Sequence, residues 1–65
     1  MNFDIWDING VEYIIAKDFA VITGVTRATV YNWIRFNYMP AVRSRNGRFL
    51  IPLKEALAWV GKNKV

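Results

Sequence analysis

Three arginines, Arg43, Arg45 and Arg48, lie close together around the dipeptide Asn46-Gly47. A guanidinium group presents its N–H donors in a fixed fork that matches the oxygens of a phosphate or a carboxylate. Asn-Gly between two apolar-rich segments is typical of a β-hairpin with a two-residue turn. Such a turn would pair Arg45 with Arg48 and, by alternation, place all three arginines on one face. We therefore expect this hairpin to carry an anion-binding face.

The same turn would set the rest of the register, pairing Ser44 with Phe49, Arg43 with Leu50 and Val42 with Ile51. Val42, Phe49 and Ile51 would then share the face that packs on the core. Arginines directly opposite each other destabilise a hairpin by up to about 1 kcal/mol, unless an anion neutralises them. A hairpin near the N-terminus would oppose Asp7 and Glu12 in the same way, so an ordinary solvated surface is the alternative interpretation.

A helix expected over residues 27–36 carries a second set of groups that could bind DNA. At about 100° per residue, Val30, Trp33 and Ile34 form its buried face. The opposite face carries Arg35, Ala28, Asn32 and Tyr31. Arginine can bond guanine and asparagine can bond adenine in bidentate geometry, and a thymine methyl can contact a small apolar side chain. An amphipathic helix with a solvated polar face is the alternative.

The residue types that most often carry catalysis or bind metals are missing, because the chain has no histidine and no cysteine. Their absence removes the usual general base, the commonest metal ligand, the thiolate nucleophile and any disulfide. Asp4 and Asp7 would lie on opposite faces of a strand, and the sequence holds no nucleophile–base constellation. We expect no enzymatic activity, no cofactor and no metal.

The net charge of +4 is unevenly distributed. Residues 1–18 carry four acids and one lysine, a sum of −3, whereas residues 19–65 carry eight basic residues and one glutamate, a sum of +7. This basic region favours a nucleic-acid partner, and a charged surface that only aids solubility is the alternative.

The length of the chain suits one domain, 1–65, and its apolar runs are too short to cross a bilayer. We expect a cytoplasmic protein that does not contact membranes.

The elements that position these groups follow from turn and capping residues. Residues 1–15 are expected to form a hairpin around Asn9-Gly10, pairing Ile8 with Val11, Trp6 with Tyr13 and Ile5 with Ile14. Both of its faces would carry large apolar groups, so one face needs a cover, for which a second copy of the chain is our hypothesis.

Two helices joined by a glycine-containing turn are expected over residues 16–36. Gly24 suits the end of the first helix, and Thr26 suits the N-cap of the second, beside which Arg27 would favour phosphate. The arginine hairpin then spans 41–51. Pro52 suits the first position of a last helix over 52–63.

The helix-turn-helix segment and the residues after it resemble a known family. The segment 16–34, AKDFAVITGVTRATVYNWI, is similar to the helix-turn-helix of the excisionase and MerR-like winged-helix superfamily. MPAVR at 39–43, before the basic turn, and RFLIP at 48–52, leading into a helix, continue the similarity. Asn32-Trp33 and Met39-Pro40 also resemble the small terminase subunit of lambda-like phages. The resemblance covers about residues 13–60 and leaves out residues 1–12.

With the first hairpin added, the resemblance implies an α+β fold: a small winged helix-turn-helix with three short helices and a β-hairpin wing in the C-terminal half. It implies that the helix from Thr26 to Phe36 enters the major groove of double-stranded DNA, with Arg27, Ala28, Tyr31 and Arg35 facing DNA. The turn Arg45–Arg48 would reach the minor groove or the backbone. The implied protein is a phage or mobile-element excisionase acting with an integrase, or a small transcriptional regulator; a terminase-like packaging protein is an alternative.

Residue chemistry and resemblance together predict one set of DNA-contacting residues: Lys17, Thr26, Arg27, Ala28, Tyr31, Asn32, Arg35, Arg43, Arg45, Asn46 and Arg48. A different class of function stays open beside it, a protein-interaction module such as a phage-encoded inhibitor of a host protein. The two-sided apolar first hairpin and the aromatic residues Tyr31, Phe36 and Tyr38 favour that alternative.

Overall fold

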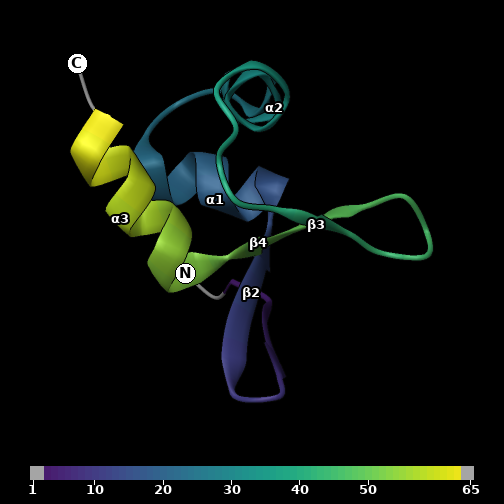
Figure 1. Cartoon of the computed structure of the whole chain (residues 1–65). Coiled ribbons are helices and arrows are strands. Elements are labelled where there is room, and N and C mark those ends of the chain that lie inside the picture. Colours follow the sequence, from purple (N-terminus) through teal and green to yellow (C-terminus); the bar gives the residue numbers. More distant parts are fainter. Residues whose placement is uncertain (1–2, 64–65) are drawn as a thin grey trace.

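A computed structural model describes residues 3–63, so the first two residues of the expected hairpin and the last two of the domain lie outside it. The described chain is a small α+β structure with three helices and one four-stranded antiparallel sheet (Figure 1). The elements are β1 (Ile5–Ile8), β2 (Val11–Ile15), α1 (Ala16–Thr23), α2 (Arg27–Phe36), β3 (Val42–Arg43), β4 (Phe49–Pro52) and α3 (Leu53–Asn63).

The first hairpin has the expected turn and register. Asn9 and Gly10 have φ of 54° and 82°, as a type I′ turn requires. The backbone N–H of Gly10 also donates to the Asp7 carboxylate at 3.0 Å. Ile5 pairs with Ile14, Trp6 with Tyr13, Asp7 with Glu12 and Ile8 with Val11, so these pairings are confirmed.

The two helices that follow begin and end at the expected residues. Gly24 has φ of 74°, and its N–H donates to the Val21 carbonyl while the N–H of Val25 donates to that of Ala20. These are the two hydrogen bonds of a glycine-terminated helix end. The Thr26 hydroxyl accepts from the N–H of Thr29 at 3.2 Å and caps α2 as expected.

The second hairpin does not have the expected register. Val42 pairs with Leu50 and Arg43 with Phe49, one residue away from the pairing that a two-residue turn would give. The Ser44 N–H donates to the Arg48 carbonyl at 2.8 Å, and only Gly47 of the turn dipeptide has a positive φ, at 79°. A type I turn followed by a left-handed glycine makes a three-residue loop.

The corrected register changes what the hairpin presents. Arg43 now lies on the same face as Phe49. The direct pairing of Arg45 with Arg48 is therefore wrong. Arg45 and Arg48 both lie in the loop outside the strands, so strand alternation does not place them on one face with Arg43. Val42 shares its face with Leu50 and not with Ile51, and its side chain is exposed.

The two hairpins join into one sheet, which the sequence did not predict. The strand order is β1-β2-β4-β3, with Tyr13 opposite Pro52, Ile14 opposite Ile51 and Ile15 opposite Leu50. Pro52 consequently ends β4, and α3 begins one residue later than expected, at Leu53.

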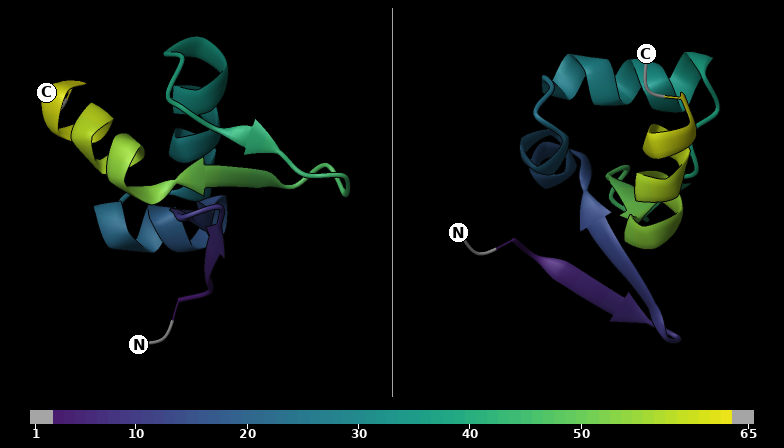
Figure 2. Two further views of the ribbon diagram at one scale, coloured as in Figure 1. Left: turned by 60° about the horizontal axis from the view of Figure 1, so that its bottom comes forward. Right: turned by 90° about the vertical axis from the view of Figure 1, so that its left-hand side faces the viewer.

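The core lies where the helices cover the inner strands. Ile14, Phe19, Val30 and Ile51 are fully buried, and Trp33 and Ile34 pack on this cluster, which confirms the expected buried face of α2. The two hairpins project away from the helices in different directions (Figures 1 and 2). Within residues 3–63, no helix is long and apolar enough to cross a membrane.

Candidate nucleic-acid interface

The outer face of α2 is open to solvent. Arg27, Ala28, Asn32 and Arg35 are all exposed, and the Tyr31 side chain is 40% exposed. The buried side of the helix holds these groups outward, because Val30 lies in the core and α2 packs against α1. The Thr26 hydroxyl, which bonds both the N–H and the hydroxyl of Thr29, is used to cap the helix.

A tilted aromatic contact connects this helix to the arginine hairpin. The Tyr31 and Phe49 ring centroids are 5.8 Å apart, with the rings tilted by 53°. The Arg43 guanidinium lies over the Phe49 ring, with its Cζ 4.9 Å from the ring centroid. Each such contact contributes about 0.5–1.5 kcal/mol. The helix and the hairpin are thereby held as one surface, although their backbones do not pack closely.

Three cationic residues from three separate segments line one hollow beside these rings. Lys17 at the start of α1, Arg27 at the start of α2 and Arg48 before β4 border an open hollow of about 270 Å³. Its remaining lining is Ile15, Ala16, Tyr31 and Phe49. The lining contains no acidic residue, so its electrostatic potential favours anions.

The other expected contact residues lie outside this hollow. Arg45 and Asn46 are exposed in the hairpin loop, and Arg35 lies in the last turn of α2 with its Cζ 5.8 Å from the Phe36 ring centroid. Sequence reasoning did not find Phe49 as part of the surface. The wrong register had assigned Phe49 to the face opposite Arg43, and only the three-residue loop brings the two side chains together.

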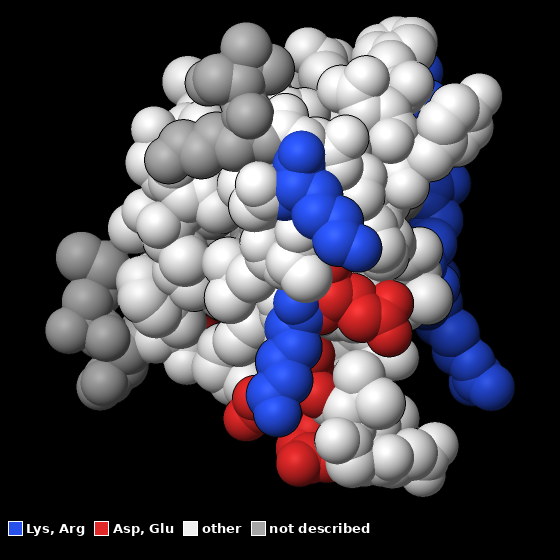
Figure 3. Space-filling view, turned by 60° about the vertical axis from the view of Figure 1, so that its left-hand side comes forward, with Lys and Arg blue, Asp and Glu red and all other residues white. Residues whose placement is uncertain are grey.

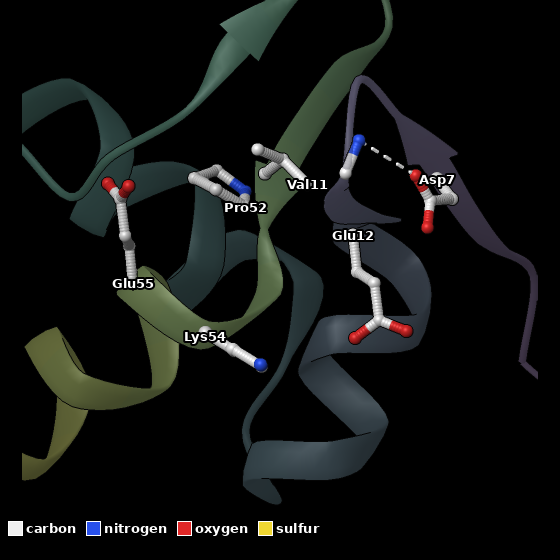
Figure 4. A pocket seen from close by; sticks show the side chains of 7 residues that line it. Asp7, Val11, Glu12, Pro52, Lys54 and Glu55 are labelled. Carbon is white, nitrogen blue, oxygen red and sulfur yellow. Dashed lines mark hydrogen bonds between the residues drawn. The ribbon is translucent and has the colours of Figure 1, made fainter.

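Acidic side chains gather elsewhere on the molecule. On the face drawn in Figure 3, they lie in the middle and lower part beside two basic side chains, and further basic side chains follow the right-hand edge. Asp7, Glu12 and Glu55 line a second hollow of about 490 Å³ together with Lys54. Their carboxylates spread apart around it (Figure 4), and the described part of the chain holds no group of three His, Cys, Asp or Glu residues that could bind a metal ion.

Comparison with known proteins adds no family to this geometry. No family model, no curated protein and no solved structure matches the chain.

Proposed function

We propose that this protein binds double-stranded DNA through the outer face of α2 and the β3–β4 hairpin, as a small winged helix-turn-helix. The observation that carries the proposal is the contact of Phe49 with both Tyr31 and Arg43, which connects the helix to the hairpin. Phosphate contacts made from a second, attached element help to fix the orientation of a recognition helix on the duplex.

The residues divide into two roles under this proposal. Asn32 and Arg35, on the exposed side of α2, contact base edges in the major groove, where each base pair presents a distinct pattern of donors and acceptors. The basic residues contact phosphates, which fix the position of the protein without reading sequence. They are Lys17, Arg27, Arg45 and Arg48.

The biological role proposed with this binding mode comes from the resemblance of residues 13–60 to excisionases and MerR-like regulators. The protein acts without catalysis on short sites, either as an excisionase beside an integrase or as a small transcriptional regulator. A footprint on an attachment region favours excision, and one on a promoter favours regulation.

Fluorescence anisotropy with a labelled random-sequence duplex tests the DNA-binding proposal. We expect affinity to fall steeply between about 50 and about 200 mM salt, because each neutralised phosphate releases counterions. Selection from a randomised duplex library should then enrich one short site. A protein that shows no salt-dependent retention on any duplex does not have this function.

A protein-interaction module is the second candidate, and the exposed apolar side chains favour it. Trp6 and Ile8 on β1 are 42% and 44% exposed. Phe36, the last residue of α2, is 68% exposed, and Tyr38 just beyond the helix is 86% exposed. Under this alternative, substitution of Trp6 and Ile8 by serine abolishes partner binding, while the arginine variants leave it unchanged.

A further inference from the structure

The hollow lined by Lys17, Arg27 and Arg48 has the features of a binding site for one compact anion. All three residues are exposed, and the described chain buries no charged residue, so their charged groups are accessible to a ligand from solvent. Lys17 and Arg27 come from two helices and Arg48 from the hairpin loop, so no local sequence pattern would bring them together.

The N-terminal end of α1 borders the same hollow. Ile15 is the N-cap of α1 and provides no side-chain hydrogen bond, unlike Thr26 at α2. Ile15, Ala16 and Lys17 all line the hollow. The first N–H groups of a helix have no partner within the helix, and the positive end of its dipole favours an anion.

We infer that this hollow binds a terminal phosphate monoester. A monoester carries a charge of about −1.5 to −2 at neutral pH and three strong acceptor oxygens, whereas each backbone phosphodiester carries a single charge. Three cationic side chains and uncapped amides therefore favour the monoester. The inference rests on the proposed function only for one source of this group, the 5′ end of a DNA strand.

The aromatic part of the lining extends the ligand class from phosphate to nucleotide. The hollow of about 270 Å³ is larger than a single phosphate group, and the rings of Tyr31 and Phe49 form part of its wall. A base or sugar attached to the phosphate can lie against these rings, since aromatic side chains stack on nucleobases with little sequence preference.

Calorimetric titration with three adenosine compounds tests this inference. We expect adenosine 5′-monophosphate to bind at least about tenfold more tightly than the 3′,5′-cyclic phosphodiester, and adenosine not to bind measurably. Affinity for the monophosphate should fall as the pH drops below about 6, where the monoester takes up its second proton. Equal affinity for the monoester and the diester would overturn the inference.

Variants locate the site. Arg27→Gln and Arg48→Gln should each weaken monophosphate binding at least about tenfold, whereas Lys62→Gln, which removes one positive charge on α3 outside the lining, should leave it unchanged. Amide resonances of residues 15–17 should shift in an NMR titration. Shifts confined to other residues, or equal losses from all three variants, would place the ligand elsewhere and refute the assignment.

Two short duplexes of identical sequence, with 5′-phosphate or 5′-hydroxyl ends, separate the sources of the monoester. Tighter binding of the phosphorylated duplex assigns the site to DNA ends, and equal binding assigns it to the nucleotide in solution. A protein that binds duplex DNA but no monophosphate disproves this inference and leaves the proposed function intact. A protein that binds monophosphate but no duplex supports this inference and disproves the proposed function.

Discussion

Loss of the three positive charges around the hollow should lower the salt dependence of DNA binding by an amount that follows from the number of phosphate contacts. Each phosphate contact contributes about −0.9 to the slope of log affinity against log salt, so a Lys17→Gln, Arg27→Gln, Arg48→Gln variant should lose about 2.7 from that slope. Between about 50 and about 200 mM salt, each contact accounts for about a 3.5-fold fall in affinity. The salt-dependent fall should therefore be about 40-fold smaller in the triple variant than in the natural protein.

Anisotropy titrations on one duplex across that salt range measure the slope directly. The three residues are exposed, and each substitution should change the free energy of unfolding by no more than about 0.5 kcal/mol. The triple variant should therefore lie within about 1.5 kcal/mol of the natural protein, which a denaturant titration checks. A Lys54→Gln, Lys62→Gln variant on α3 is the control, because both residues are exposed and neither lines the hollow or lies on α2. A slope that is the same in the triple variant and the natural protein would refute the assignment of this hollow to the DNA interface.

Three further predictions concern α2 and the glycines. Asn32→Ala and Arg35→Ala should each reduce the discrimination between preferred and random duplex by about 1–3 kcal/mol with little change in salt slope; a uniform loss on all sequences would contradict the base-reading role. Thr26→Ala should lower the free energy of unfolding by about 1 kcal/mol in urea, because it removes the hydroxyl that accepts from the N–H of Thr29, and no change would mean that solvent replaces the cap. Gly47→Ala should destabilise the protein by about 1–2 kcal/mol, because its φ is 79°, whereas Gly61→Ala within α3 should stabilise it by about 0.5–1 kcal/mol, since nothing lies within 4 Å of the added Cβ. Thermal unfolding should move in opposite directions for the two glycine variants, and a shift in the same direction would contradict the backbone argument.

Local chemistry explains why much of the fold could be predicted. Asn9-Gly10 sets the first hairpin because both residues must adopt positive φ in a type I′ turn, and they do. Gly24 and Thr26 set the end of α1 and the start of α2 through hydrogen bonds that span five residues or fewer. Features that depend on neighbours in the chain are readable from the sequence.

The second hairpin shows where local reasoning failed. Asn46-Gly47 is the same dipeptide as Asn9-Gly10, yet it sits in a three-residue loop with a positive φ only at the glycine. Strand β4, which pairs with both β2 and β3, is held by the central sheet, and the loop adapts to that pairing. A turn signal therefore does not set the register when the strand beside it is already fixed by other contacts.

The sequence by itself determined the helices, the first hairpin, the asymmetry of charge and the outward face of α2, because capping, turn geometry and helical periodicity act over a few residues. Only the tertiary structure decided that the two hairpins share one sheet, that Phe49 contacts both Tyr31 and Arg43, and that Lys17, Arg27 and Arg48 line one hollow. These arrangements join residues far apart in the chain, and their positions depend on how the helices and strands pack around Ile14, Phe19 and Ile51. Periodicity within one segment carries no information about that packing.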